Sequence, residues 1–485
     1  MMRPILAGLD TEYGFSVEAR GAENQIEDSQ TFVRTFPGTA FVGWDYRHEA
    51  PRSDLRGFRL DALAFDPEDA KFDAGRTYGS SVEIRSDRVL TTGGRFYNDH
   101  GHPEYATPEC FTLRGLVGHE LAGDEILRQT ARAYEDKTGK SVALYKNNTD
   151  FHGASWGTHE NYLVSRSVGY EKLFKGVMPM LLVRQILTGS GKVGSETGAK
   201  VPYQISQRAD FIVEPANAET LYRRPLFNTR DEPHSRPTDF IRLHVISGDA
   251  NMIAASTFRK VGLVKLAVAL TEIGAAPLWD IKDPVRSFQS ISRDEGYRFE
   301  IPLAKDSWTT ADEILESYFS AAERFLDLDE ELQSIIDEGR KLLQSLRTDF
   351  PSFARTVDWA AKRQMLEMYM QDSGTDWNDP ALRSYDLEYH NLNADESLHS
   401  ALVDMDLVVP NPEAIWEPEH SRAWVRGYAI QNFASHLKSA AWRSLTFEVN
   451  GQQEDVELWP DQTYNLELDA LANVNTFIQA MREMK

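Results

Sequence analysis

Residues 95–110, RFYNDHGHPEYATPEC, concentrate side chains that can bind ions or move protons. In an extended strand, successive side chains point to opposite faces, so Arg95, Tyr97 and Asp99 would share one face. Phe96 would then face the apolar layer behind. This alternation predicts that a cation, a phenol and a carboxylate enter one cavity, with further acidic groups close behind in the sequence.

Two signals predict where this strand begins and ends. The pair Gly93-Gly94 is typical of a turn. Pro103 is expected to stop the strand because it lacks a backbone N–H, so Glu104 and Thr107 would follow in the exit loop. The stretch is therefore interpreted as a strand and its exit loop.

Three interpretations of these polar residues compete. A charged strand face is often simply solvated. A zinc site could use His100, His102 and Glu104, but zinc usually takes three or four nitrogen or sulfur ligands, and the sequence contains no HExxH or CxxC motif. Carboxylates beside a phenol suit magnesium better. The choice depends on the other segments of the chain.

Three other segments are equally dense in such groups: GLDTEYG (8–14), GTHENYL (157–163) and RPLFNTRDEPH (224–234). Their candidate side chains are Asp10, Glu12, His159, Glu160, Arg224, Arg230, Asp231, Glu232 and His234. Asp10 and Glu12 would lie on the same face of a strand. Each segment alone is commonly a structural ion pair, but together they supply carboxylates for magnesium, arginines for phosphate and a spare carboxylate. These are the parts of an ATP-dependent site that activates a carboxylate.

The composition limits the class of protein. The 485 residues, 41% hydrophobic and 26% charged, predict a globular chain with one large and one smaller domain, or two to three ordinary domains. The net charge of −23 argues against binding to duplex nucleic acid. Cys110 is the only cysteine, which excludes an intrachain disulfide and fits a reducing compartment. With no membrane-length apolar run and no signal peptide, we expect a cytoplasmic protein without membrane or nucleic-acid partners.

The residue pattern predicts an α+β fold with strands first and helices later. Expected strands span 5–9, 81–84, 142–145, 162–165 and 241–246, and expected helices span 119–136, 170–188, 257–273 and 466–483. The region 310–372 is expected to be helical, with a capping box formed by Thr310 and Glu313. Asn450-Gly451 predicts a hairpin turn.

Two irregular regions divide the chain. Residues 44–80 are predicted to be a long inserted loop, partly mobile. The segment 408–419 is expected to separate a large domain, 1–405, from a small C-terminal domain, 406–485. The glycine-rich run LTGSGKVGSE, 187–196, fails as a phosphate-binding loop because Val193 follows Lys192, although it could border the site as a turn.

Eight motifs together resemble the family of Pup ligases and Pup deamidases/depupylases, which is related to glutamine synthetase. They are GLDTEYG, RFYNDHGHPEYATPEC, LYKNNTD, GASWGTHENYL, TGSGKVG, SQRADFI, NTRDEPH and RLHVISGDANM. The resemblance covers nearly the whole chain. It implies a glutamine synthetase-like large domain, with a curved, mostly antiparallel sheet that holds ATP and magnesium, and a small C-terminal domain.

The resemblance also assigns roles to single residues. It implies that Asp99 is the catalytic carboxylate. Its implied metal ligands are Asp10, Tyr97 and Glu104, and its implied nucleotide contacts are Arg95, Thr107 and Trp442. Asp10 stands where the family has Glu, one methylene longer. Glu12 is a further candidate metal ligand and Arg230 a further candidate phosphate contact, while His159, Glu160, Arg208 and His244 complete the candidate site.

Two branches of the family share this site but run opposite reactions. Ligases join Pup to a lysine through a γ-glutamyl phosphate, whereas the hydrolytic branch removes Pup, or deamidates its C-terminal Gln, with the nucleotide as a cofactor. The loop that begins at WDYRHEAPRSDLRGF (44–58) and the spacing of DHGHPEY (99–105) favour the hydrolytic branch. The expected cofactors are ATP, or ADP plus phosphate, and Mg²⁺, and the expected partner is Pup or a Pup-like protein. A ligase, or a homologue that binds Pup without turnover, remains the alternative.

Overall fold

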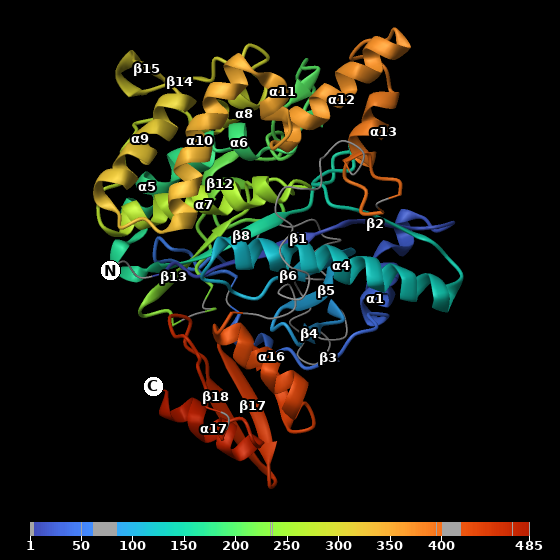
Figure 1. Ribbon diagram of the computed structural model, residues 1–485, viewed down its shortest axis with the longest axis vertical. Coiled ribbons are helices and arrows are strands. Elements are labelled where there is room, and N and C mark those ends of the chain that lie inside the picture. Colours follow the sequence, from blue (N-terminus) through green and yellow to red (C-terminus); the bar gives the residue numbers. More distant parts are fainter. Residues whose placement is uncertain are drawn as a thin grey trace.

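A central antiparallel sheet organises the larger part of the molecule (Figure 1). The computed structural model describes residues 4–49, 51–61, 85–232, 234, 236–393, 395–399, 419–467 and 469–484. Seven strands follow the order β13-β8-β1-β6-β5-β4-β3, and each neighbouring pair is antiparallel. Their bounds are β1 (Ala7–Glu12), β3 (Ala40–Phe41), β4 (Arg88–Leu90), β5 (Arg95–Asp99), β6 (His102–Ala106), β8 (Thr158–Ser165) and β13 (Phe240–Val245). The fold is α+β, with mixed helices and antiparallel sheets.

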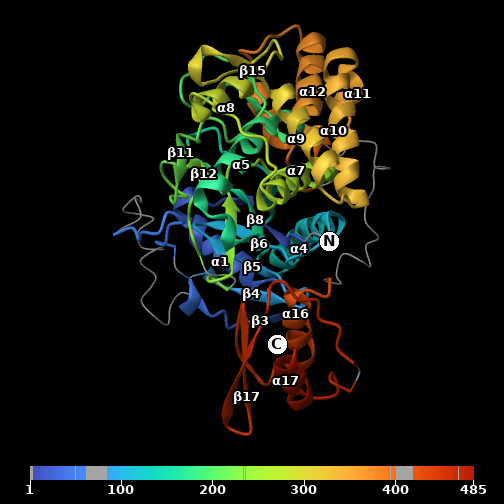
Figure 2. The ribbon, with the colours of Figure 1, turned by 90° about the vertical axis from the view of Figure 1, so that its left-hand side faces the viewer.

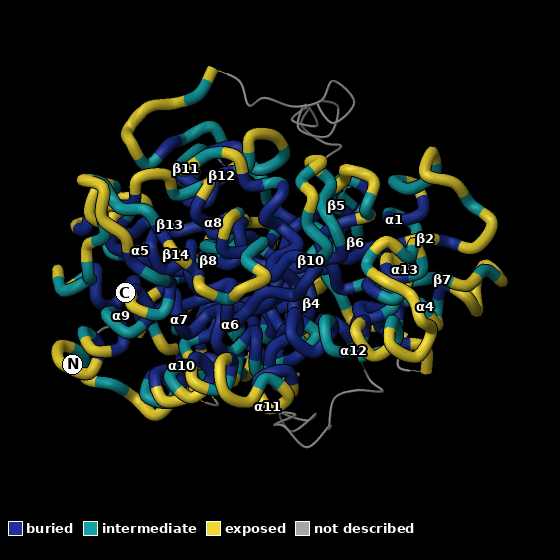
Figure 3. Tube along the Cα trace, turned by 90° about the horizontal axis from the view of Figure 1, so that it is seen from above, coloured by how far each residue is buried: buried dark blue, intermediate teal, exposed yellow. Residues whose placement is uncertain are grey.

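Helices cover the sheet and build most of the apolar core (Figures 1 and 3). The helix α7 (Ala254–Glu272) lies buried among its neighbours over most of its length, and its buried residues include Arg259, Lys260 and Lys265. Around it lie α4 (Leu113–Thr138), α5 (Tyr170–Val183), α9 (Ala311–Phe325) and α10 (Glu330–Thr348). Further helices are α1 (Gln25–Arg34), α6 (Gln185–Thr188), α8 (Pro284–Ser292), α11 (Phe350–Ala354), α12 (Asp358–Ser373) and α13 (Ala381–Glu388).

Short strands complete the larger part. They pair as β2 (Gly14–Val17) with β7 (Val142–Tyr145), β9 (Lys192–Val193) with β10 (Tyr203–Gln204), β11 (Glu214–Asn217) with β12 (Pro225–Asn228), and β14 (Glu300–Pro302) with β15 (Trp308–Thr310). Within the described residues, no helix has the length and apolarity needed to cross a membrane.

The C-terminal elements form a separate layer beyond the edge of the central sheet (Figures 1 and 2). They are α16 (Arg422–Phe433), the sheet of β16 (Leu437–Ala441), β17 (Ser444–Val449) and β18 (Gln452–Glu457), and α17 (Val474–Glu483). Their apolar core also contains Trp44 and Val89 from the N-terminal part of the chain. The backbone of Trp44 pairs in parallel with Ala440 of β16. The C-terminal layer therefore packs against Trp44 and Val89, which are far from it in the sequence.

Many of the expected elements are confirmed. The strand β7 has the expected bounds, and β13 and α7 lie within three residues of theirs. The strand β8 and the helix α4 are confirmed but longer, because they begin at Thr158 and Leu113 rather than at 162 and 119. Gly274 follows α7 with φ = +73°. Thr310 and Glu313 form the predicted capping box. The hairpin between β17 and β18 turns at Asn450-Gly451, where both residues have positive φ.

Two expected helices differ from the structure, and three further expectations are not tested by it. The expected helix 170–188 divides at Arg184 into α5 and α6. The last helix begins at Val474 rather than at 466, because Asn473 caps it with bonds to the backbone N–H groups of Asn475 and Thr476. The predicted strand 81–84, the domain boundary near 406 and most of the inserted loop, residues 62–80, lie outside the described residues.

Pro103 was expected to end the strand that begins at Arg95, but that strand, β5, already ends at Asp99. Pro103 lies inside β6, so Glu104 is a strand residue and not part of an exit loop. The Pro103 carbonyl accepts a bond from the N–H of Tyr13. The Tyr13 carbonyl lies 3.0 Å from Nδ1 of His102, a side-chain contact that takes the place of the N–H that proline lacks.

Candidate active site

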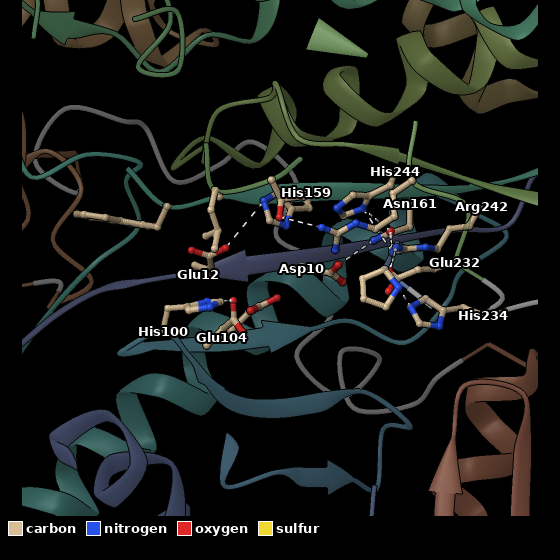
Figure 4. A pocket seen from close by; sticks show the side chains of 18 of the residues that line it. Asp10, Glu12, His100, Glu104, His159, Asn161, Glu232, His234, Arg242 and His244 are labelled. Carbon is tan, nitrogen blue, oxygen red and sulfur yellow. Dashed lines mark hydrogen bonds and ion pairs between the residues drawn. The ribbon is translucent and has the colours of Figure 1, made fainter. Parts of the chain in front are cut away.

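One large cavity, about 1290 Å³ in volume, lies between the face of the central sheet and the C-terminal layer. Side chains from β1, β5, β6, β8 and β13 line it, together with Arg422 and Trp442 from the C-terminal elements. Figure 4 shows Glu12 and Glu104 with His100 at one end of this cavity, and Arg242 with Glu232, His234 and His244 at the other. The candidate residues are therefore gathered by the sheet and not by one continuous segment.

The alternation predicted for residues 95–99 is confirmed. Arg95, Tyr97 and Asp99 line the cavity from β5, while Phe96 is fully buried in the opposite layer. The β5–β6 hairpin places Glu104 directly opposite Tyr97, whose hydroxyl donates to the Glu104 carboxylate at 2.6 Å. This hairpin thus supplies most of the acidic end of the cavity.

Three carboxylates meet at this end: Glu12, Asp99 and Glu104 each offer an oxygen within 4.8 Å of the others. Glu12 on β1 is the cross-strand partner of Glu104 on β6, an arrangement in which like charges repel. Burial, together with the charge of Asp99, raises the pKa of Glu12 to about 7 and the pKa of Glu104 well above its usual value. A divalent cation fits this donor set, because it would supply the positive charge that three adjacent carboxylates require.

Asp99 differs from its two acidic neighbours because cations contact it directly. One carboxylate oxygen lies 2.9 Å from Nη1 of Arg85, and the other lies 2.9 Å from Nδ1 of His100. Burial alone would raise the pKa of Asp99, but His100 and Arg85 outweigh it and hold the pKa well below its usual value. Asp99 is therefore the member of the cluster whose pKa is lowered, whereas the pKa values of Glu12 and Glu104 are raised.

Asp10 lies in the cavity but outside this three-carboxylate cluster. Its carboxylate accepts a bond of 3.0 Å from the side-chain amide of Asn161. Burial raises the pKa of Asp10, and the nearby Arg242 opposes that rise. Of the two acidic residues that β1 directs into the cavity, Glu12 is the one placed beside Asp99.

Arg95 stands in an aromatic cage that suits a nucleotide. Its guanidinium lies 3.9 Å from the ring centroid of Trp44, 4.3 Å from that of Tyr97 and 5.8 Å from that of Trp442. It pairs with Asp87, yet its Nε is buried without a hydrogen-bond partner among the described residues. Such a buried, incompletely bonded donor fits a phosphate or a nucleotide oxygen.

Thr107 and Trp442 border the same region. The Thr107 hydroxyl accepts a bond of 3.0 Å from the N–H of Leu9 and faces the cavity. The partly buried indole of Trp442 packs edge-to-face on Trp44, with 4.9 Å between the ring centroids. The three residues predicted to contact the nucleotide, Arg95, Thr107 and Trp442, therefore line the same cavity.

Histidines and arginines line the cavity next to the three carboxylates. His159 stands 3.9 Å from Glu12 and packs against His244. Burial, followed by the charge of Arg208, lowers the pKa of His159 to about 3. Arg208 donates to the carbonyl of Ile246. Arg208 and Arg230 line the cavity here, and their guanidinium groups suit a phosphate or carboxylate group.

Glu160 belongs to the other face of β8. Its carboxylate is fully buried, receives two bonds of 2.6 Å from the Arg184 guanidinium and one from the Tyr162 hydroxyl. It is absent from the cavity lining. Lys192 of the glycine-rich run is also buried away from the cavity, although its partner Asp210 lines it.

Sequence reasoning missed several residues that line the cavity. Asn161 lies two positions after His159 on β8, and Arg242 lies two positions before His244 on β13. Strand alternation places residues two positions apart on the same face, so it could have identified both. Arg85 and Glu49 carry no such signal because they lie in or beside irregular segments. Glu109 and Arg422 form an ion pair of 2.6 Å across more than 300 residues, which no local pattern reveals.

Comparisons with known proteins agree with this architecture. The sequence matches the family model described as Pup-ligase protein over residues 5–446. It is 34% identical over 467 residues to a depupylase of Acidothermus cellulolyticus, with 92% of this chain and 91% of that protein covered. It is 33% identical over 469 residues to a Pup deamidase/depupylase of Mycobacterium tuberculosis, with the same coverage. A Pup–protein ligase of Nakamurella multipartita is 37% identical over 332 residues, covering 66% of this chain and 73% of the ligase.

Solved structures extend the likeness to three dimensions. The crystal structure of the ligase PafA in complex with Pup matches with a TM-score of 0.77 at 28% identity, covering 99% of this chain and 92% of that chain. The structure of PafA in complex with ADP matches with a TM-score of 0.72 at 30% identity, covering 88% and 96%. The chain therefore belongs to the Pup-ligase family.

Proposed function

We propose that this protein is a nucleotide-dependent amide hydrolase that removes Pup, or a Pup-like modifier, from lysine side chains and deamidates a C-terminal Gln of the modifier. The observation that carries the proposal is the position of Asp99, which contacts Arg85 and His100 inside a cluster of three carboxylates and faces an aromatic and arginine-lined cavity. A module that only binds Pup has no need of such a cluster. We also propose that the protein has a glutamine synthetase-like architecture, that a small C-terminal domain begins at 406, and that the protein is cytoplasmic.

Two features favour hydrolysis over ligation. The long segment between β3 and β4 precedes the proposed catalytic hairpin. The depupylase and the Pup deamidase/depupylase are 34% and 33% identical over 92% of this chain, whereas the ligase PafA, whose structure covers 99% of it, is 28% identical. The ligase of Nakamurella multipartita aligns over a smaller share. A Pup ligase is the second candidate, because the family and the fold are common to both activities.

The residues of the site divide the chemical work. Arg95, Thr107 and Trp442 would hold the nucleotide, with Arg230 available to its phosphates. Magnesium bound by the carboxylates would offset their mutual repulsion and polarise a phosphate or carbonyl oxygen. Its proposed ligands are Glu12, Glu104, Tyr97 and Asp10. Asp99 then acts as a general base on water or attacks the scissile carbonyl itself.

Cleavage and conjugation measured together test this proposal. The protein is incubated with ATP, magnesium and a substrate protein that carries Pup on a lysine, and the products are followed by gel. A parallel reaction contains free Pup with a C-terminal Glu and the unmodified substrate. We expect release of Pup without stoichiometric ATP consumption. Conjugation with matching ATP consumption would instead identify a ligase.

Glu104→Ala is expected to remove most of the magnesium dependence of ATP binding. A ligand that binds only the folded state raises its thermal stability, so wild type should show a larger ATP-induced shift with magnesium than without it. Asp231→Asn is the control, since Asp231 pairs with Arg166 and is absent from the cavity lining. An unchanged magnesium effect in Glu104→Ala would show that Glu104 is only a structural carboxylate.

A further inference from the structure

Glu109 is the carboxylate of the 95–110 stretch that the proposed chemistry leaves without a role. It is buried just after β6, and its oxygens accept bonds from Nε of Arg422 at 2.6 Å and from both terminal nitrogens of Arg426. Its backbone carbonyl accepts a bond of 2.7 Å from the hydroxyl of Ser421, the N-cap of α16. Side chain and main chain of Glu109 therefore both hold the first turn of α16.

Arg426 extends this contact in two directions. Its Nε and Nη2 donate to the carbonyl of Gly93, in the turn that precedes β5, at 3.1 and 3.0 Å. Its Nη1 donates to the carbonyl of Trp442 at 3.1 Å, and its guanidinium lies 4.9 Å from the centroid of the Trp442 ring. One fully buried guanidinium thus connects both ends of the β5–β6 hairpin with the backbone that carries Trp442.

The contact between α16 and the turn before β5, called the junction below, is tightly packed. Gly93 has φ = +81°, and a Cβ added there would lie 2.1 Å from the carbonyl oxygen of Ala423. A Cβ added at Gly427 would lie 2.0 Å from the carbonyl oxygen of Thr91. The helix α16 and the turn before β5 therefore touch backbone to backbone, so the ion pairs act on a close-packed contact.

On the cavity side, the same junction carries an aromatic wall. Trp442 and Trp44 meet edge-to-face, and Arg95 lies against both rings. Trp44 is held in turn by the backbone pairing of residues 43–45 with Ala440. The position of Trp442 relative to Arg95 is thus set by contacts that begin at Glu109.

We propose that Glu109 is a positioning residue for the nucleotide: through Arg422 and Arg426 it fixes Trp442, so that the nucleotide base packs on the wall formed by Trp442 and Trp44. This inference rests on the proposed function, because it takes Trp442 as a nucleotide contact. Without the carboxylate, two buried guanidinium groups would face each other uncompensated, and α16 would move away from the hairpin. The base would lose its wall while the phosphate contacts of Arg95 and Arg230 persist.

Binding of ADP and of inorganic pyrophosphate, both with magnesium, separates these two effects. We expect Glu109→Gln to weaken ADP binding about tenfold, the lower range seen when a group that orients a ligand-contacting residue is removed. Pyrophosphate has no base, so its affinity should stay within about twofold of wild type. The KM for ATP should rise while kcat changes little, which a merely structural role would not produce.

Two further variants make the test decisive. Arg426→Lys keeps a cation beside Glu109 but lacks the planar fork that also bonds the Trp442 carbonyl, so it should show the same selective loss of ADP even if Glu109→Gln folds poorly. Asp386→Asn is the matched control: Asp386 is a buried carboxylate paired with Lys362 and absent from the cavity lining. It should lower thermal stability without changing the ratio of the two affinities.

Equal losses of ADP and pyrophosphate binding in Glu109→Gln and Arg426→Lys would overturn the positioning role, as would unchanged ADP binding in both. The proposed function fails by a different result, namely wild-type protein that binds neither ADP nor pyrophosphate. That result would overturn the positioning role with it. A selective loss of ADP in both variants supports the inference.

Discussion

Asp99→Asn is expected to abolish isopeptide cleavage and deamidation while ATP binding persists. Asparagine keeps the shape of the side chain but removes the charge that His100 and Arg85 maintain on Asp99. Loss of a general base alone lowers the rate on the order of 10²–10⁴-fold, and loss of a nucleophile removes the reaction path. Cleavage is measured by gel under single-turnover conditions, and ATP binding by thermal shift.

The same experiment can distinguish the two roles open to Asp99. Direct attack on the scissile carbonyl would form an anhydride at Asp99, which hydroxylamine converts to a hydroxamate that mass spectrometry can locate. A single turnover in oxygen-18 water would place label in Asp99 if that anhydride opens on the enzyme side. General-base action predicts neither product. Near wild-type cleavage by Asp99→Asn would contradict both roles.

Arg184→Met is expected to cause the largest loss of stability. Glu160 is fully buried and receives both of its short guanidinium bonds from Arg184, so the substitution would leave a carboxylate charge without a counter-ion inside the protein. Breaking a buried pair by removing one partner costs about 3–5 kcal/mol of unfolding free energy. Urea unfolding measures this loss, and the KM for ATP of the folded protein should be unchanged because the pair lies away from the cavity lining.

A double variant provides the control. Glu160→Gln combined with Arg184→Met removes both charges, while the glutamine can still accept the bond from the Tyr162 hydroxyl. We expect this variant to regain most of the stability lost in Arg184→Met. If Arg184→Met unfolds like wild type, the Glu160–Arg184 pair does not hold β8 against α5. If it raises the KM for ATP, Glu160 acts on the site after all.

The sequence pattern predicted which side chains share one face of a strand, but it did not predict which residues of the adjacent strand lie opposite them. Period-two alternation placed Arg95, Tyr97 and Asp99 on the cavity side because a buried face on one side fixes the other. It also placed Asp10 and Glu12 on one face, but it could not show which of them lies beside Asp99. That depends on the register of β1 with β6, which brings Glu12 opposite Glu104. Register is a property of two strands and cannot be derived from one.

Contacts that involve an irregular strand residue or a distant segment could not be predicted either, because they also depend on a second part of the chain. Pro103 was expected to end a strand because its missing N–H normally breaks a ladder, yet a side chain, His102, makes the replacing bond. Glu109 was visible in the sequence, but its partners Arg422 and Arg426 come from α16, which carries no motif. Local pattern predicts an element, whereas the partner across the fold is decided by packing of the whole chain.

The pairing of Trp44 with Ala440 has a consequence for how the protein is made. During synthesis, the β5–β6 hairpin leaves the ribosome long before α16 and the sheet of β16, β17 and β18 exist. Until those elements emerge, Trp44 and Val89 have no apolar cover, and the turn at Gly93 lacks the helix that packs on it. Contacts between segments so far apart form late and slowly. A chain that ends before α16 therefore lacks the apolar residues that cover Trp44 and Val89 in the folded protein.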